Sequence, residues 1–122
     1  ITLGTDHPSW GEFLSPFSVH RELLSFVLSG IPESDVIKFA TINGARAMHA
    51  GDYLGSIESG KIADLVVLSG SPLKDIKNIR NPYMVMKDGQ VYDPQDLLRS
   101  VEGTIGPRGS REERAWKPLG NR

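Results

Sequence analysis

Residues 55–68 read Gly-Ser-Ile-Glu-Ser-Gly-Lys-Ile-Ala-Asp-Leu-Val-Val-Leu, and the fold expected for the chain is built around this stretch. Its first three residues, 55–57, are predicted to form a short strand. Residues 58–61 are predicted to form a tight turn, in which Gly60 takes a positive φ. Residues 63–68 are apolar at five of six positions, which is typical of a strand buried on both faces. The stretch is therefore interpreted as part of a folded core.

Asp64 is the exception in that apolar run. A carboxylate in a buried strand requires hydrogen-bond partners, because burying an unpaired charge is costly. We expect backbone N–H donors or an arginine beside it, and we interpret Asp64 as a structural residue.

Downstream of this stretch the sequence predicts a β-hairpin. Residues 82–87 and 90–92 are predicted strands, and Asp88-Gly89 between them is a strong signal for a two-residue turn. Residues 69–81 are a long connection. A short helix is predicted over 96–101, and the Gly, Pro, Arg and Glu content of the segment that follows it is typical of a loosely docked tail.

Upstream, the sequence predicts a strand followed by two helices. Residues 1–3 are apolar and β-branched, and they lead into Gly4-Thr5-Asp6. A helix is predicted over 15–29, with Ser15 at its N-terminus and Gly30 ending it. A second helix begins at 33, and Asn43-Gly44 is expected to end it.

Composition limits the classes of protein to consider. The chain has 122 residues, a net charge of −1 and no cysteine, which excludes disulfides and thiolate metal sites and gives no reason to expect nucleic acid as a partner. No apolar run approaches the ~20 residues of a membrane span, so no membrane partner is expected and the cytoplasm is the default location. The chain starts at Ile1 without a methionine, and we interpret it as a fragment.

Three segments together resemble a known family. They are Ala-Thr-Ile-Asn-Gly-Ala-Arg-Ala at 40–47, the stretch from Leu54 to Leu68, and Val-Met-Lys-Asp-Gly-Gln-Val-Tyr at 85–92. Their order is similar to the C-terminal part of the amidohydrolase superfamily, near its imidazolonepropionase-like and prolidase-like members. The resemblance covers about residues 1–93.

The resemblance implies an α+β fragment of a larger fold. Residues 1–50 would be the last strand and the helices of a (β/α)₈ TIM barrel, and residues 51–93 would supply C-terminal strands of a composite β-sandwich. Residues 94–122 would be a short helix and a mobile tail. Because a complete barrel takes about 250 residues, the rest of the barrel is the first partner expected.

The resemblance also implies a role for Asp6. At the C-terminal end of the last barrel strand, this carboxylate would bind a divalent metal, with Zn²⁺ expected, and would carry a proton between the metal-bound water and the leaving group. His7 and Trp10 are the candidate contacts to a small-molecule substrate; the alternatives are that His7 packs within the loop and that Trp10 anchors it. From pattern alone, a turn cap before Pro8 is the favoured interpretation of Asp6, and the resemblance reverses that preference.

The three histidines do not reproduce the histidine ligands of the family. Of the chain's own three histidines, His7 is the candidate substrate contact named above. The other two are expected to be structural. We expect His20 to be packed and hydrogen-bonded on the apolar side of its helix, and His49 to cap a helix end. We expect Asn43 to terminate one helix and cap the next.

The function implied is hydrolysis of a C–N bond in a cyclic amide, an N-acyl compound or a dipeptide by metal-activated water. The chain alone is expected to be inactive, because one carboxylate does not hold a catalytic metal. The rival interpretation is a non-enzymatic assembly or binding module built on the strands. In either case exposed sheet edges and apolar helix faces favour association, so a homo-oligomer is expected.

Overall fold

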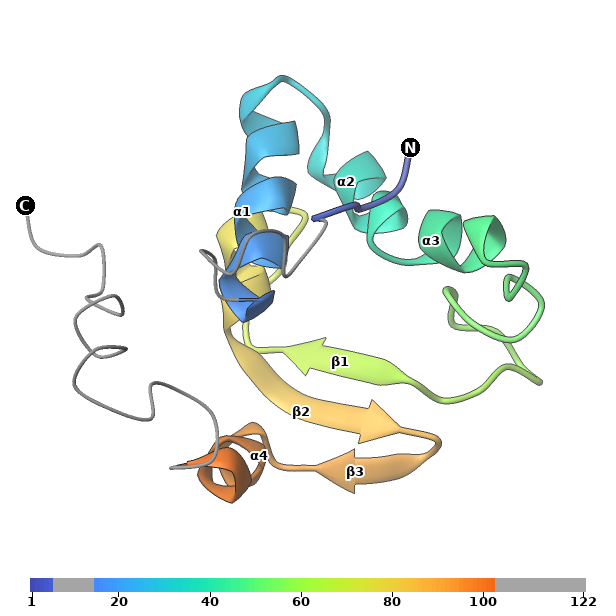
Figure 1. Cartoon of the computed structure of the whole chain (residues 1–122), viewed down its shortest axis with the longest axis vertical. Helices are drawn as coiled ribbons and strands as arrows, with labels where there is room; N and C mark the ends of the chain where they lie inside the picture. The colour runs from blue at the N-terminus through green and yellow to red at the C-terminus, as the bar shows by residue number, and fades with distance from the viewer. Residues whose placement is uncertain (6–14, 103–122) are drawn as a thin grey trace, which may run out of the picture.

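The computed structural model describes residues 1–5 and 15–102, and its helices and strands form two groups (Figure 1). Three helices lie together, and a three-stranded sheet lies beside them with a fourth helix at its end. The elements follow in the order α1 (Ser15–Leu28), α2 (Glu33–Phe39), α3 (Ile42–Ala47), β1 (Leu65–Leu68), the 3-10 helix η1 (Ile76–Arg80), β2 (Pro82–Lys87), β3 (Gln90–Tyr92) and α4 (Pro94–Val101). None of the helices described is long and apolar enough to cross a membrane.

The core is small and joins α1, α2 and η1. Leu23, Val36 and Ile76 are buried, and each comes from a different one of these elements. Phe26 packs edge-on against Phe39, with ring centroids 5.5 Å apart. The predicted helix over 15–29 is confirmed to within one residue, and the chain turns out of it at Gly30, which has a φ of 89°. Glycine adopts this left-handed conformation without a steric penalty.

The expected break at Asn43-Gly44 is wrong. The helix ends at Phe39, and Asn43 and Gly44 lie inside α3. The break falls at Thr41, whose φ and ψ of −128° and −101° are not helical and whose side-chain hydroxyl donates to the carbonyl of Ile37. Asn43 does not cap α3 either, because its side-chain amide donates to the carbonyl of Ile1 instead.

The predicted hairpin is confirmed in both strands and in its turn. The sheet is antiparallel with the order β1-β2-β3, and Val85 pairs with Val66 on one side and Tyr92 on the other. Asp88 and Gly89 both have positive φ, 50° and 77°. Two positive φ values in a two-residue loop define the type I′ turn, whose twist matches that of the paired strands.

Two predicted strands are absent from the described part of the chain. Residues 55–57 form bends rather than a strand, although the turn after them is present, with Gly60 at a φ of 90°. Residues 1–3 are extended but pair with no strand described here. The expectation that β1 is buried on both faces is also wrong: Val66 is 58% exposed and Val67 40%. The reason is that β1 is an edge strand and the described residues supply no second layer over it.

The loop between α3 and β1 is held by two contacts. Gly55, at a φ of 90°, packs so closely on α3 that an added Cβ would lie 2.7 Å from the Cβ of Ala45. Lys61 donates to the carbonyl of Gly51 at 2.8 Å and to the hydroxyl of Ser56 at 2.5 Å. The geometry of this loop thus depends on a glycine contact and on one largely buried lysine.

Asp64 has the partners that a carboxylate at this position requires. Its Oδ1 accepts from the backbone N–H of Asp88 at 2.7 Å, and its Oδ2 accepts from Lys87 at 2.6 Å. The backbone donor was expected, and the cation is a lysine rather than an arginine. The hydrogen bond from Lys87 lowers the pKa of Asp64 most, and the one from the Asp88 backbone lowers it further. Together they join the start of β1 to the hairpin turn.

We expect Asp64→Asn to remove part of the pH dependence of stability. Because the pKa of Asp64 is lowered on folding, its stabilising contribution is present above its unfolded pKa and is lost as the pH falls through the folded pKa. The gap between the urea midpoints of the wild type and the variant should therefore be larger at about pH 7 than at a pH below about 3.9, the ordinary pKa of an aspartate. An equal gap at both pH values would contradict this account.

The short C-terminal helix begins two residues earlier than predicted. Asp93 caps α4 by accepting from the backbone N–H of Gln95 at 2.7 Å, and Pro94 occupies the first turn, where its missing N–H costs nothing. The helix packs against β2. The predicted tail from residue 103 lies outside the described residues.

Candidate functional site

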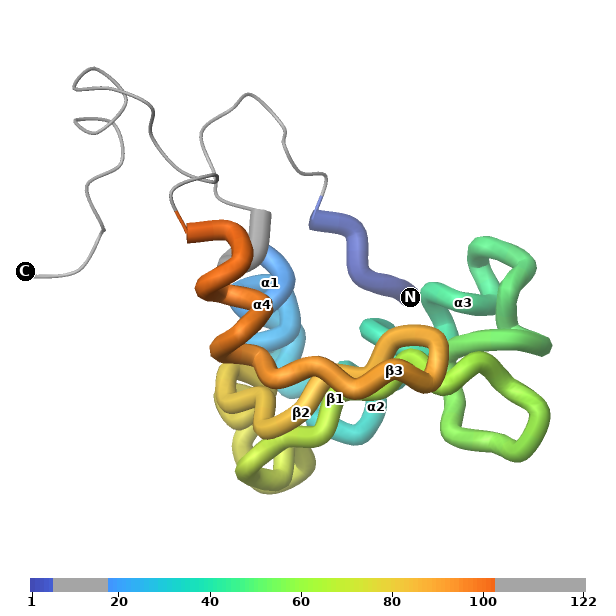
Figure 2. Tube along the Cα trace, turned by 90° about the horizontal axis from the view of Figure 1, so that it is seen from below, coloured from blue at the N-terminus to red at the C-terminus, as the bar shows by residue number. Residues whose placement is uncertain are grey.

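The predicted site residues follow a well-anchored segment in the sequence. Asp6, His7 and Trp10 fall within residues 6–14, outside the described part of the chain. Residues 1–5, called here the N-terminal segment, are described. Figure 2 shows the segment starting near α3 and running to the point where residue 6 follows. Its contacts show how the chain is held just before Asp6.

Two helices hold the start of the N-terminal segment. The carbonyl of Phe39, at the end of α2, accepts from the Thr2 hydroxyl at 3.3 Å and from the Leu3 backbone N–H at 3.4 Å. The side-chain amide of Asn43 on α3 donates to the Ile1 carbonyl at 2.9 Å. Carbonyls at a helix C-terminus lack intrahelical donors, so Phe39 is a natural acceptor for a passing segment.

A third helix holds the end of the segment. Oε1 of Glu22, on α1, accepts from the backbone N–H of Gly4 at 3.0 Å. Its second oxygen, Oε2, is buried and has no hydrogen-bond partner among the described residues. The sequence predicts no role for Glu22, because the contact joins residues 18 positions apart and has no local sequence signal.

Close packing at α3 allows this arrangement. A Cβ on Gly44 would lie 3.3 Å from the Thr2 hydroxyl oxygen, tighter than ordinary van der Waals contact. Beside it is an open hollow of about 260 Å³, lined by Ile1, Thr2, Asn43, Arg46 and Ala47. The lining is mostly apolar and contains no acid–base pair, so the hollow supports no catalytic role.

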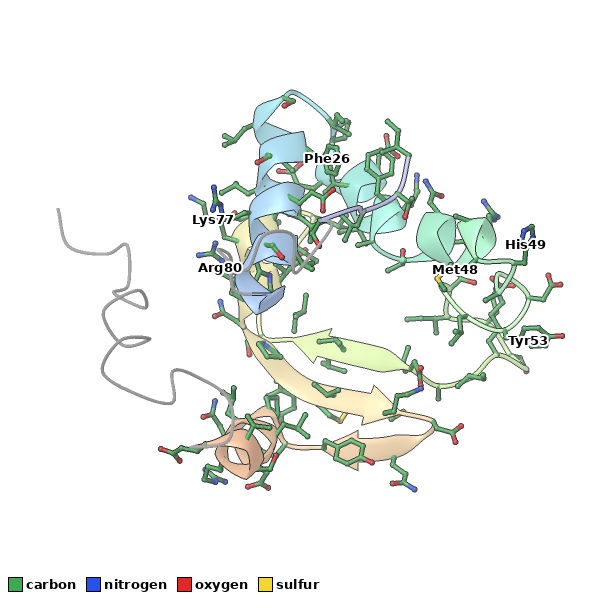
Figure 3. All side chains as sticks on the ribbon, in the orientation of Figure 1. Phe26, Met48, His49, Tyr53, Lys77 and Arg80 are labelled. Carbon is green, nitrogen blue, oxygen red and sulfur yellow. The ribbon has the colours of Figure 1, made fainter. Side chains whose placement is uncertain are left out.

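The two described histidines are far apart in the fold. His20 is on α1, and His49 follows α3 with an exposed side chain and a φ of 58° (Figure 3). The backbone N–H of His49 donates to the carbonyl of Arg46, so His49 lies just after the end of α3, and its capping role stays a prediction. His20 differs from expectation, because its Nδ1 is buried without a hydrogen-bond partner in the described structure. Burial, and then the charge of Arg80, lower the pKa of His20.

The described residues alone do not form a metal centre. Within 1–5 and 15–102, no group of three or more His, Cys, Asp or Glu side chains is placed to hold a metal ion. A metal that Asp6 binds would need its further ligands from outside these ranges. What the described structure shows is how residues 1–4, which precede Asp6 in the sequence, are held by α1, α2 and α3.

Comparison with known proteins identifies the family. Residues 1–92 match the family described as the amidohydrolase family. This chain belongs to the amidohydrolase family. The match covers the N-terminal segment, α1 to α3 and the whole sheet, as the sequence resemblance predicted, and it ends before α4.

Relatives within the amidohydrolase family carry several activities in their names. The chain is 36% identical over 74 residues to a 5-methylthioadenosine/S-adenosylhomocysteine deaminase of Thermoanaerobacter pseudethanolicus, covering 56% of this chain and 17% of the relative. It is 48% identical over 52 residues to an imidazolonepropionase of Picrophilus torridus, covering 43% of this chain and 12% of the relative. The chain therefore spans about a fifth or less of the length of these relatives.

Two solved structures are similar to the fold of this chain. A molinate hydrolase superposes over 89% of this chain and 27% of its own, with a TM-score of 0.71 and 31% identity. A Xaa-Pro dipeptidase with bound methionine in its active site superposes over 61% of this chain and 18% of its own, with a TM-score of 0.59 and 40% identity. The expected nearness to imidazolonepropionase-like and prolidase-like members is confirmed.

Proposed function

We propose that this chain is the C-terminal part of a metal-dependent hydrolase that cleaves a C–N bond in a small molecule. The observation that carries the proposal is the family match over residues 1–92. A cyclic amide, an N-acyl compound or a dipeptide is the proposed substrate class, and relatives named imidazolonepropionase and Xaa-Pro dipeptidase support it. A cytoplasmic location is proposed as well.

In this proposal the described elements are parts of a larger fold. Residues 1–50 belong to the end of a (β/α)₈ barrel and residues 51–93 to a composite β-sandwich, with the rest of the barrel as their partner. The exposed apolar side chains of the sheet support this placement, because monomeric proteins rarely leave such a surface uncovered. Val66, Tyr83 and Val91 are 58%, 73% and 59% exposed.

Asp6 is the proposed metal-binding and catalytic residue, with His7 and Trp10 as proposed substrate contacts. The support is the resemblance and the position of Asp6, two residues after a backbone amide held by Glu22. A bound Zn²⁺ would lower the pKa of a water molecule towards ~7. The carboxylate of Asp6 would then accept a proton and return it to the leaving nitrogen.

The same exposed sheet also favours a second candidate, a non-enzymatic module that assembles with other copies through β1 or β3. Both are edge strands of the described sheet, and edge strands pair readily with other chains. In that case the chain would form homo-oligomers without any partner barrel.

Activity measurements distinguish the two candidates. The protein expressed from the complete reading frame should hydrolyse members of a panel of N-acyl amino acids, dipeptides and cyclic amides. The activity should be lost after chelation and return with added Zn²⁺. Residues 1–122 alone should show no turnover in the same assay. A complete protein that is inactive with every metal and substrate class tested, but forms stable oligomers, would favour the module.

A further inference from the structure

Glu22 makes a contact that its place on a helix does not require. Its carboxylate reaches from α1 to the N-terminal segment, and one oxygen is used there while the other is buried without a partner in the described structure. A glutamate on a solvated helix face normally keeps both oxygens in water. Burial of a carboxylate oxygen is unfavourable, so this side chain gains from ordering the segment that it contacts.

The contact is the described tether nearest to Asp6. The hydrogen bonds from Asn43, Thr2 and Leu3 hold residues 1–3 to α2 and α3. Glu22 holds Gly4 from α1, so a different helix binds each end of the segment. A hydrogen bond to a charged acceptor is also stronger than the neutral ones upstream.

We propose that Glu22 is a positioning residue for Asp6, an inference that rests on the proposed function. Asp6 follows Gly4 by two residues, which span at most about 7 Å of chain, so losing the hydrogen bond at Gly4 would loosen the backbone that leads directly to Asp6. A displacement of about 1 Å at a catalytic group lowers a rate by about 10²-fold. Glu22 touches no reacting atom in this scheme and acts only through the backbone of residues 4–6.

The first test measures the tether without any metal or substrate. Amide hydrogen exchange in the 122-residue chain should be at least tenfold faster at Gly4 in Glu22→Ala than in wild type, and unchanged at Leu3, whose acceptor is Phe39. Glu22→Gln keeps an acceptor oxygen and should retain most of the protection. Ser25→Ala is the matched control on α1, because its hydroxyl bonds only within the helix, to the carbonyl of Arg21. Equal exchange at Gly4 in wild type and Glu22→Ala would overturn the tether.

The second test measures its effect on the reaction of the complete protein. Glu22→Ala should lower kcat at least tenfold and change KM less than threefold, and Glu22→Gln should restore kcat to within about threefold of wild type. Should Glu22→Ala not fold, Gly4→Pro removes the same N–H donor with Glu22 intact, and Gly4→Ala keeps the donor at a position open to a Cβ. Gly4→Pro should then show the lowered kcat and Gly4→Ala should not.

The outcomes separate the inference from the function on which it rests. If Asp6→Asn is inactive while Glu22→Ala has wild-type kcat, the positioning role is wrong and the proposed function stands. If Asp6→Asn is fully active, the proposed catalytic role of Asp6 fails and the positioning role fails with it, while the proposed hydrolysis itself stands. Loss of activity in Glu22→Gln equal to that in Glu22→Ala would also overturn the role, because the acceptor would then not be what matters.

Discussion

Asp6→Asn in the complete protein is expected to lower kcat by about 10³-fold. Asparagine keeps the size of the side chain and removes both the negative charge and the ability to accept a proton. The proposed role needs both properties, one for binding the metal and one for moving the proton. The measurement is kcat on the best substrate of the panel, with the metal content of each preparation determined in parallel.

The control for this variant is Asp52→Asn, which removes the same charge from an exposed turn position. It should retain wild-type activity and metal content. An Asp6→Asn protein with full activity would show that the carboxylate is a turn cap and not a catalytic group.

Gly55→Ala is expected to destabilise the chain by about 3 kcal/mol. The φ of 90° at Gly55 is strained for any residue with a Cβ. In addition, the new Cβ would lie 2.8 Å from the Cα of Ile42, which is backbone that cannot move aside without shifting α3. The measurement is the free energy of unfolding of the 122-residue chain in urea.

Gly60→Ala is the matched control, because Gly60 has the same φ of 90° but open space where the Cβ would be. It should lose only the conformational part, about 1 to 2 kcal/mol. The difference between the two variants therefore measures the contact between the loop and α3. Equal losses in both variants would contradict the close packing described for Gly55.

Local chemistry explains which parts of the fold were predictable. Asp88-Gly89 favours one turn type strongly enough to define both flanking strands, and Gly30 ends α1 because glycine alone takes its conformation cheaply. These signals act over two to four residues. No distant contact is needed to read them.

Distant contacts explain what was not predictable. Asn43-Gly44 has the composition of a helix breaker, yet it lies in α3 because Gly44 packs on Thr2 and Asn43 bonds Ile1, about 40 residues away. The burial of β1 was overestimated. An apolar strand sequence shows that the strand needs neighbours over its faces, but not whether residues 1–122 supply them.

The candidate site was predictable only in part. Asp6 was singled out by resemblance to the amidohydrolase family and by its place after a predicted strand, not by geometry. The role of Glu22 has no sequence signal, because a glutamate at helical spacing among serines and an arginine is typical of a solvated face. Its hydrogen bond to Gly4 appears only when the two segments are folded together.

Anomalous scattering at the zinc absorption edge, from crystals of the complete protein, tests the central claim most directly. An anomalous peak at about 2.0–2.2 Å from a carboxylate oxygen of Asp6 is the predicted result. A zinc peak with Asp6 turned away from it would contradict the assignment of Asp6. Absence of any peak from an active protein would contradict a zinc-dependent hydrolase.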